Sequence, residues 1–384
     1  MMISRKAVAL VSVAAIIASA CSSSATTPSA AVITPTTAPT TAVVASAAAP
    51  SVAAKPCTVG VSWNNYQEER WAKWDEPAIK AALTKGGATY ISNDAKSSTD
   101  TQASNVDALI NQGAKVVVIL AQDGTAIKPS VAKALAAGVS VIAYDRLIED
   151  TGAFYITFDN VLVGKMQAQA VLAAKPAGNF VIIKGNKADA NADFLRAGMV
   201  QAGVPDVGKT DPTGKIKIVG EQYTDNWDPA NAQNEMASIL TKQANKVDAV
   251  ISENDGMAGG VIAALKSQGL AGTVPVSGQD GDAAALNRIA LGTQTVDVWK
   301  DAHMLGQSAG EAAVALCGGT TMDKITTTNG ASKIFNSPLK NALNSILLTP
   351  QAITKDNLSV VLDAKWIDAA TLCKGVAAGA VKGC

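Results

Sequence analysis

The stretch Val59–Trp74, VGVSWNNYQEERWAKW, passes from an apolar run into a cluster of aromatic, amide and charged side chains. Three of the six tryptophans, Trp63, Trp71 and Trp74, lie within it, although only 4% of the chain is aromatic. Similar apolar runs follow, such as KVVVILAQD and NFVIIKG, and alternate with Ala-rich segments of helical period. Near-continuous apolar strands separated by helices indicate parallel sheets covered on both faces. Because ten such runs are too many for one open sheet, we expect an α/β fold of two doubly wound sheets.

Polar side chains follow nearly every predicted strand. The pairs are Asn93-Asp94, Gln122-Asp123, Asp145-Arg146, Asp159-Asn160, Asn254-Asp255, Gln279-Asp280 and Lys300-Asp301. Open α/β sheets bind ligands just beyond the carboxyl ends of their strands. Any single Asn or Asp could instead cap the following helix. The whole set, with two cations in it, predicts a polar ligand-binding cleft.

A helix is expected from about Glu68 to Lys85, directly after the first strand. Arg70 and Trp71 would lie on its first turn and face the ligand. Trp74, three residues on, would anchor the helix to the sheet. Pro77 lies inside this segment, so that the helix either kinks there or begins anew with Pro in its first turn.

The first 56 residues are expected to lie outside the fold. Residues 1–21 have a basic start, an apolar segment and small residues before Cys21, as in a secretory signal. The ASA preceding Cys21 fits simple cleavage, and the Cys itself fits a bacterial lipobox, in which Cys21 would be lipidated. Residues 22–56 are almost wholly Ala, Ser, Thr, Pro and Val, which predicts a disordered tether. We therefore expect an exported protein, lipid-anchored to the outer face of the bacterial cytoplasmic membrane.

Composition excludes several classes of site and partner. Lys and Arg together number 32, as do Asp and Glu, and no basic stripe indicates a nucleic-acid partner. Four cysteines after Cys21 predict two disulfides in an oxidising compartment, and their pairing stays open: Cys57, Cys317, Cys373 and Cys384. Their spacing is not that of a zinc site, and the glycine motifs of nucleotide cofactors are absent. We expect no metal and no cofactor.

The chain also has no evident catalytic group. His303 is its one histidine, and no nucleophile elbow is present. An exported α/β protein with a polar cleft and no catalytic motif suggests a binding protein. Paired carboxylates leave a glycosidase as the alternative.

The residue types of the cleft favour a sugar as the ligand. Asp and Asn beside Arg and Lys offer donors and acceptors side by side, as vicinal hydroxyls require. A flat indole covers the apolar C–H face of a sugar ring. Trp71 and Trp227 are the candidates for this contact, and Trp74 and Trp366 are assigned to packing.

The sequence resembles the periplasmic sugar-binding proteins of ABC importers, which have the type I fold. The landmarks are EERW (68–71), AYDRLI (143–148), YITFDN (155–160), ANADFLRAG (190–198), DNWDPANA (225–232), ENDGMAGG (253–260), SGQDGD (277–282), GTQTVDVWK (292–300) and ILLTP (346–350). The resemblance spans about residues 59–363. It implies that Trp71 and Trp227 sandwich the sugar ring. It also implies the following hydroxyl contacts: Arg70, Asp145, Arg146, Asn191, Asn254, Asp280 and Lys300.

DFLRAG favours the D-xylose-binding branch of this family. Other positions depart from that branch. Asn64 and Asn65 stand where it has acidic residues, Gln67 replaces a basic residue, Glu68 an apolar one, and Gln122-Asp123 an aromatic–amide pair. Glucose or another aldose is therefore kept as an alternative ligand.

The resemblance also implies two lobes joined by a three-strand hinge. The crossings would lie near Asp159-Asn160, Asp297–Asp301 and Leu348–Pro350. Residues 57–159 and 301–347 would form the N-terminal lobe, and 160–300 and 348–384 the C-terminal lobe. A monomer would close on the sugar and be recognised by an ABC permease. A sensor that presents the sugar to a membrane receptor is the alternative, whereas a DNA-binding regulator would need a helix-turn-helix where the tether stands.

Overall fold

The computed structural model describes residues 57–207, 211 and 213–384 of the chain. The predicted signal peptide (1–21), the lipidation of Cys21 and the tether (22–56) lie outside the described residues. In the described part, no helix combines the length and the apolar character needed to cross a bilayer.

The first sheet has seven strands in the order β13-β14-β5-β4-β3-β1-β2. All neighbouring pairs are parallel except β13 with β14. Strand residues alternate between two apolar cores: Val116 and Val118 face one side, Val117 and Ile119 the other. The strands are β1 (Thr58–Trp63), β2 (Thr89–Asp94), β3 (Val116–Ile119), β4 (Ser140–Tyr144), β5 (Ala153–Phe158), β13 (Lys333–Asn336) and β14 (Ala342–Leu348).

Two helices cover each face of this sheet. Helices α1 (Glu76–Lys85) and α9 (Ala302–Cys317) pack together on one face, with Ile79 and Leu305 in the same core as Val118. Helices α2 (Thr99–Asn111) and α3 (Lys128–Ala136) cover the other face. Both faces are thus buried, which explains why the strands read as nearly continuous apolar runs.

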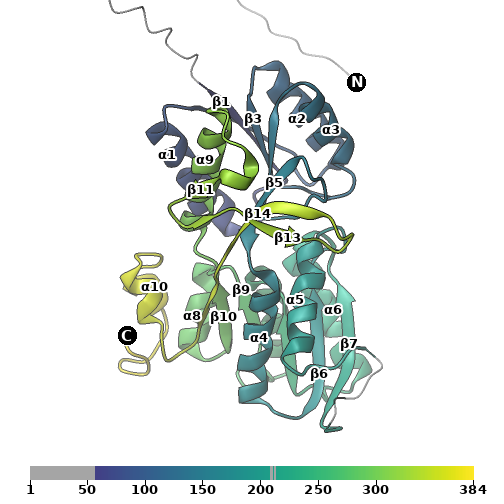
Figure 1. Cartoon of the computed structure of the whole chain (residues 1–384). Helices are drawn as coiled ribbons and strands as arrows, with labels where there is room; N and C mark the ends of the chain where they lie inside the picture. The colour runs from purple at the N-terminus through teal and green to yellow at the C-terminus, as the bar shows by residue number, and fades with distance from the viewer. Residues whose placement is uncertain (1–56, 208–210, 212) are drawn as a thin grey trace, which may run out of the picture. The chain divides into compact units, whose positions relative to one another are not determined.

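A second group of strands comprises two three-stranded sheets, β7-β6-β8 and β15-β10-β9. An isolated parallel bridge between Val250 and Val276 links them. The strands are β6 (Gly178–Lys184), β7 (Ile216–Tyr223), β8 (Ala249–Ser252), β9 (Ser277–Gln279), β10 (Val296–Trp299) and β15 (Gln351–Ile353). Helices α4 (Asn160–Ala174) and α5 (Ala190–Gln201) lie side by side (Figure 1). Helices α6 (Pro229–Lys242) and α7 (Asp255–Ser267) also pack together, and α8 (Ala283–Leu291) precedes β10.

The ten apolar runs expected as strands all form, as β1 to β10, and the α/β class with doubly wound parallel sheets is confirmed. The chain passes from one group of strands to the other after Phe158, after Trp299 and after Leu348. The crossings predicted from the sequence lie at these positions. The assignment of whole lobes, 57–159 with 301–347 and 160–300 with 348–384, stays a prediction.

The helix after β1 runs from Glu69 to Lys85 and contains a π-helical turn, Trp71–Asp75. Within this turn the Glu76 amide donates to the Trp71 carbonyl, one residue farther back than in an α-helix. Pro77 then occupies the first turn of α1. Since Pro has no N–H to donate, the wide turn just before it accommodates the residue without ending the helix.

The expectation that Trp74 anchors this helix to the sheet is wrong. Its ring stacks on Trp366 at 4.7 Å and lies 4.6 Å from the His303 ring. Trp366 belongs to the apolar cluster of Trp299 and Ile353, close to the C-terminus. Trp74 therefore packs against residues of the second group of strands and of the C-terminal segment.

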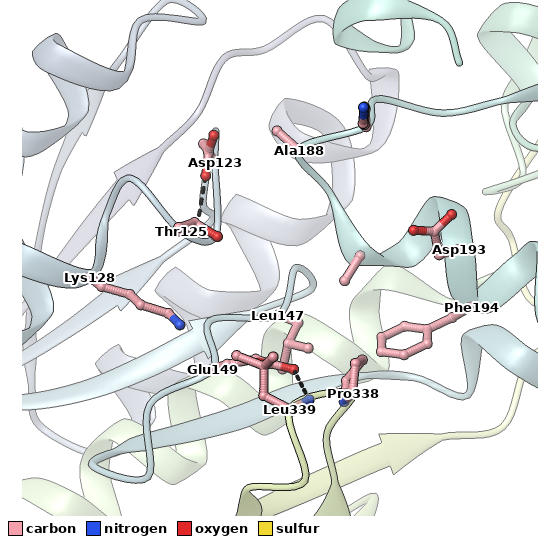
Figure 2. A pocket seen from close by; sticks show the side chains of 13 residues that line it. Asp123, Thr125, Lys128, Leu147, Glu149, Ala188, Asp193, Phe194, Pro338 and Leu339 are labelled. Atoms are coloured by element: carbon pink, nitrogen blue, oxygen red, sulfur yellow. Dashed lines mark hydrogen bonds between the residues drawn. The ribbon is translucent and has the colours of Figure 1, made fainter. Parts of the chain in front are cut away.

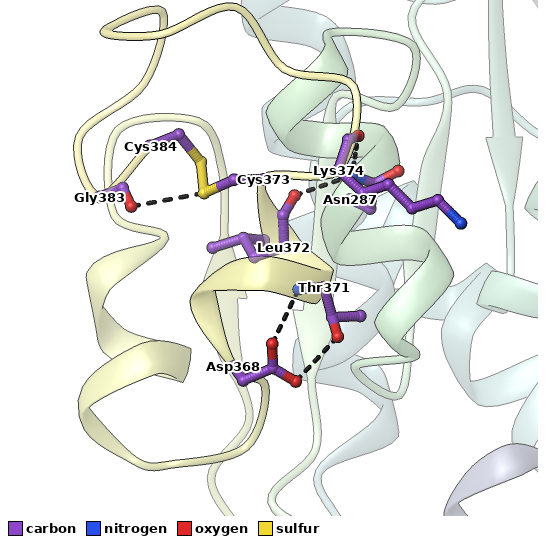
Figure 3. Close-up of a disulfide and its surroundings, with 8 residues drawn as sticks. All are labelled: Asn287, Asp368, Thr371, Leu372, Cys373, Lys374, Gly383 and Cys384. Carbon is purple, nitrogen blue, oxygen red and sulfur yellow. Dashed lines mark hydrogen bonds between the residues drawn. A yellow bond between two sulfur atoms is a disulfide. The ribbon is translucent and has the colours of Figure 1, made fainter.

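Two disulfides form, as the sequence predicts, and the structure resolves their pairing. Cys57, next to β1, joins Cys317 at the end of α9. The C-terminal segment contains α10 (Ser359–Asp363) and α11 (Ala369–Leu372). Cys373, directly after α11, joins Cys384 at the end of this segment (Figure 3). The Asn287 side chain on α8 donates to the backbone carbonyls of Leu372 and Lys374, which flank Cys373.

Candidate functional site

Eight of the nine residues assigned to sugar binding line a single cavity of about 270 Å³, including open solvent. They are Trp71, Asp145, Arg146, Asn191, Trp227, Asn254, Asp280 and Lys300. The ninth, Arg70, lies directly behind the lining and donates from Nη1 to Asp280 at 3.2 Å. The structure therefore brings all nine residues together, although they span more than half of the sequence.

Strand ends position most of this set. Asp145 and Arg146 directly follow β4, Asp280 follows β9 and Lys300 follows β10. Two of these residues have left-handed backbone conformations, with φ of 60° at Asp145 and 104° at Asp280. Such conformations cost on the order of 1–3 kcal/mol each in a non-glycine residue and are concentrated at functional sites.

Asn254 combines the two roles that the sequence left as alternatives. Its Oδ1 accepts from the Met257 amide at 2.9 Å and so caps α7. Its Nδ2 donates to Glu68 at 3.1 Å, on the cavity side. Asn191, in the first turn of α5, donates to the Asp145 carbonyl at 3.2 Å and accepts from Asn160 at 2.9 Å. At the start of α7, capping and cleft formation are therefore compatible in one residue.

A buried network of charges underlies the cavity. The Arg70 guanidinium donates to both oxygens of Asp75, at 2.9 and 2.8 Å, and lies 3.3 Å from Asp145. Lys300 pairs with Asp280 at 2.9 Å and lies 3.8 Å from Asp145. All five side chains are at least nine-tenths buried. Such ion pairs are costly to desolvate, so their concentration here indicates a functional site.

Asp145 is the least satisfied member of the network. Burial alone would raise its pKa, but Lys300, Arg70 and Arg146 together hold the pKa of Asp145 below its usual range. The carboxylate is therefore ionised at neutral pH. Its buried Oδ2 is the atom that lies 3.3 Å from Arg70 and 3.8 Å from Lys300, but it accepts no hydrogen bond within the described part of the chain. A buried ionised oxygen of this kind is a ready acceptor for a ligand hydroxyl.

The two candidate tryptophans are both buried in the cavity wall, and the Nε1 of each is without a hydrogen-bond partner among the described residues. The Arg70 guanidinium lies 4.4 Å from the centre of the Trp71 ring, a cation–π contact. The Trp227 ring packs on Gly185, where a Cβ atom would come within 2.0 Å of the indole. Neighbouring residues thus hold both indole rings in place, and the rings give the cavity wall an apolar part.

Three further residues line the cavity and were missed: Glu68, Asp189 and Gln279. Asp189 pairs with Arg146 at 3.0 Å and caps α5, and its position one residue before that helix was the signal that could have found it. Gln279 ends β9 and belongs to a strand-end pair already noted. Glu68 was known only as a departure from the family pattern.

Three of the other departures, Asn64, Gln67 and Gln122, also have partners near the cavity. Gln122 donates to the Asn226 side chain at 2.8 Å, and Gln67 donates to the carbonyls of Asn226 and Trp227 at 3.3 Å. Asn64 donates to Gln122 at 3.4 Å. Through these side-chain amides, the segments that follow β1 and β3 contact the loop that contains Trp227.

A larger hollow, of about 970 Å³ including open solvent, lies elsewhere on the described surface (Figure 2). Asp123 there accepts from the Thr125 amide, Glu149 accepts from the Leu339 amide, and Lys128 extends toward the opening. Its lining includes none of the nine assigned residues and no tryptophan. We therefore take the smaller, buried cavity as the candidate site.

Comparisons with known proteins agree with this geometry. The Periplasmic binding protein domain family matches residues 59–321. The D-xylose-binding periplasmic protein of Escherichia coli (strain K12) is 40% identical over 306 residues, which cover 79% of this chain and 89% of the relative. The multiple sugar-binding periplasmic receptor ChvE of Rhizobium radiobacter is 33% identical, with 82% and 91% covered.

A solved structure extends the comparison to the fold. The solute-binding protein of an ABC transporter from Clostridium phytofermentans, solved with bound β-D-glucose, superposes with a TM-score of 0.71 at 26% identity, covering 82% of this chain and 99% of its own. The expectation of a binding protein, with a glycosidase as the alternative, is thereby resolved in favour of binding. The chain belongs to the periplasmic sugar-binding proteins of ABC transporters, a family of binding proteins and not of enzymes.

Proposed function

We propose that this protein captures a monosaccharide, in the first place D-xylose, in the cavity lined by Asp145 and Lys300 and delivers it to an ABC importer. The observation that carries the proposal is the buried Asp145 carboxylate, ionised and with an Oδ2 that accepts no hydrogen bond from the described residues, in a wall that also contains two indoles. A sugar supplies hydroxyl donors for the carboxylate and an apolar ring face for the indoles.

The charges of the site favour a neutral ligand. Cations and carboxylates are already paired within the protein: Arg70 with Asp75, Asp145 and Asp280, Arg146 with Asp189, and Lys300 with Asp280 and Asp145. An anionic ligand would meet Asp145 and Asp280, and a cationic one would meet Arg70 and Lys300. A polyol can exchange hydrogen bonds with both signs without disturbing this balance.

The relatives support D-xylose first and other aldoses second. Two D-xylose-binding periplasmic proteins are 40% and 36% identical to this chain, and two multiple sugar-binding proteins are 33% and 31% identical. Glucose is the alternative ligand, as is the role of a sensor that presents the sugar to a membrane receptor. We further propose an exported monomer, lipid-anchored through Cys21, whose two lobes, 57–159 with 301–347 and 160–300 with 348–384, close on the sugar.

Titration calorimetry of the purified chain against a panel of pentoses and hexoses tests the ligand class. We expect D-xylose to bind with the highest affinity and to raise the melting temperature in proportion to the logarithm of its excess. If no monosaccharide binds while a peptide or nucleoside does, the sugar proposal fails. Specific co-purification with a permease, rather than with a signalling receptor, separates transport from sensing.

A further inference from the structure

Glu68 is a carboxyl group of the cavity wall that the proposed contacts do not use. It lies just before the helix that follows β1, and only 8% of its surface is exposed. Its Oε2 accepts from Asn254 at 3.1 Å. Its Oε1 has no hydrogen-bond partner among the described residues, although the side chain lines the cavity.

The cations of the cavity do not need Glu68 as a counter-ion. Arg70, Arg146 and Lys300 each form an ion pair with an Asp, and none of the described cations pairs with Glu68. A buried carboxyl group that neutralises no charge needs another explanation, because burying it is costly.

The surroundings of Glu68 keep it protonated. Burial is the largest influence, and the nearby Asp280 carboxylate adds to it, whereas Arg146, Lys300 and Arg70 oppose it; together they raise the pKa of Glu68 to about 8. The uncharged Asn254 amide is its contact from α7. At neutral pH the group is therefore a neutral acid, which can accept through one oxygen and donate through the other.

A purely structural role explains the Glu68 oxygen that accepts from Asn254, but not the other oxygen or the presence of a titratable group. One acceptor oxygen is sufficient to hold Asn254, and an amide would supply it without a group that titrates. The free oxygen of Glu68 belongs to a side chain that lines the same 270 Å³ cavity as Trp71 and Trp227. The position of this second oxygen is therefore what a ligand can use.

We propose that Glu68 is a specificity-determining ligand residue, whose free carboxyl oxygen hydrogen-bonds one hydroxyl of the bound aldose that the Asp and Arg network does not reach. The inference rests on the proposed function, since it names a further contact of the same site. It narrows the expected ligands to aldoses with an intact hydroxyl at that ring position. The protein should bind the monodeoxy derivative that lacks this hydroxyl more weakly than the parent sugar.

A double-mutant cycle between protein and sugar tests the proposal. The dissociation constants of the best sugar and of each of its monodeoxy derivatives are measured for the wild type, Glu68→Leu and Glu68→Gln. One derivative is expected to bind the wild type about 10- to 100-fold more weakly than the parent sugar, as follows from leaving a buried polar group unpaired. For Glu68→Leu the same derivative and the parent should bind within about threefold of each other, because the partner of the hydroxyl is gone.

Controls separate contact from structure. Glu68→Gln keeps an acceptor for Asn254 and a donor for the sugar, so its preference for the parent sugar should persist. Glu69→Gln is the matched surface control, since Glu69 pairs only with Lys73 on the exposed side of the helix. Thermal unfolding without sugar checks that each variant folds, and the Gln variant carries the test if Glu68→Leu does not fold.

Two outcomes overturn the proposal in distinguishable ways. If the wild type and Glu68→Leu give the same ratio for every monodeoxy derivative, or if Glu68→Gln discriminates none of them, Glu68 does not contact the sugar while the proposed function stands. If the wild type binds no monosaccharide at all, the proposed function fails and this inference fails with it.

Discussion

The Arg70 guanidinium donates to the Asp280 carboxylate at 3.2 Å across a sequence separation of 210 residues. Arg70 follows β1 of the seven-stranded sheet, and Asp280 follows β9 of the second group of strands. The same guanidinium lies 3.3 Å from Asp145, which follows β4. A single cation thus connects strand ends of both groups, so the polarity of the cavity depends on their being together.

Asp145→Ala is expected to abolish most sugar binding. The change removes an oxygen that can accept a hydrogen bond from the sugar, and it leaves the buried Arg70 and Lys300 with less countercharge. Truncating one partner of a buried charge pair costs on the order of 2–5 kcal/mol. Titration calorimetry with the best sugar should show an affinity loss of this size.

Lys128→Ala is the matched control for Asp145→Ala. Lys128 lies in the larger, open hollow of Figure 2 and should leave the sugar affinity unchanged. If the Lys128 variant loses binding while the Asp145 variant keeps it, the ligand occupies the other hollow and the site assignment is wrong.

The part of the site that adjoins strand ends could be predicted from the sequence. Asp145, Asp280 and Lys300 each follow a strand directly, and carboxyl ends of parallel strands meet at one edge of the sheet by necessity. Asn191 sits on a helix, and only the family resemblance assigned it. Glu68 lies just before the helix that follows β1 and does not directly follow a strand, so no strand-end pattern in the sequence points to it.

In the fold, too, features set by local sequence could be predicted, whereas contacts between distant residues could not. Ten apolar runs became β1 to β10 because each run is long enough to cross a buried sheet. The contact of Trp74 with Trp366 joins residues almost 300 positions apart, and local pattern gives no information on such a pair. The disulfide pairing likewise needed coordinates, since four cysteines allow three connectivities.

Gly185→Ala is expected to weaken sugar binding through Trp227. A methyl group at this position would lie 2.0 Å from the indole, so the ring must move away from its place in the cavity wall. Forced overpacking of this kind costs about 1–3 kcal/mol, and we expect a similar loss of binding free energy. Gly318→Ala is the control, because its nearest neighbour would lie at an ordinary 3.4 Å. Equal affinities for both variants would show that the Trp227 ring does not contact the sugar.

The two disulfides should differ in their contribution to stability. Cys57–Cys317 closes a loop with a sequence separation of 260, and Cys373–Cys384 one of 11. In the loop-entropy description the longer loop stabilises more, by about 5–6 kcal/mol against about 3 kcal/mol or less. Denaturant unfolding of the Cys57→Ser/Cys317→Ser and Cys373→Ser/Cys384→Ser double variants measures the difference. A larger loss of stability in the Cys373→Ser/Cys384→Ser variant would contradict the expectation. The sugar affinity of this variant should remain that of the wild type.

Asp255 and Asp297 should make the stability of the protein depend on pH. Both are buried, and each accepts a hydrogen bond from the Gly281 amide, at 3.1 and 3.2 Å. Burial raises the pKa of each well above its usual range, and neighbouring carboxylates, Asp297 for the first and Asp282 for the second, add to the effect. The folded state therefore holds more protons than the unfolded state above the unfolded pKa, and stability falls as pH rises from there toward the folded pKa.

Asp297→Asn tests this expectation because an amide mimics the protonated acid. The variant should gain stability relative to the wild type as pH increases from about 5 to 8, by about 1–3 kcal/mol at the upper end. Urea unfolding at several pH values measures the difference. Asp356→Asn, at an exposed position, is the control and should show a constant difference. A loss for Asp297→Asn that is equal at every pH would mean that the pair does not titrate in this range.

Sugar affinity should fall as pH rises through about 8. The protonated Glu68 can donate to a sugar oxygen while it accepts from Asn254, and ionisation removes that donor. Because Glu68 has a pKa of about 8 in the free protein, affinity should be constant near pH 6 and decline by up to tenfold per pH unit above 8. Calorimetric titrations of the wild type and Glu68→Gln between pH 6 and 9 measure the two profiles. The Gln variant cannot titrate at this position, so its profile should be flat; parallel slopes in both proteins would assign the proton to another group of the cavity.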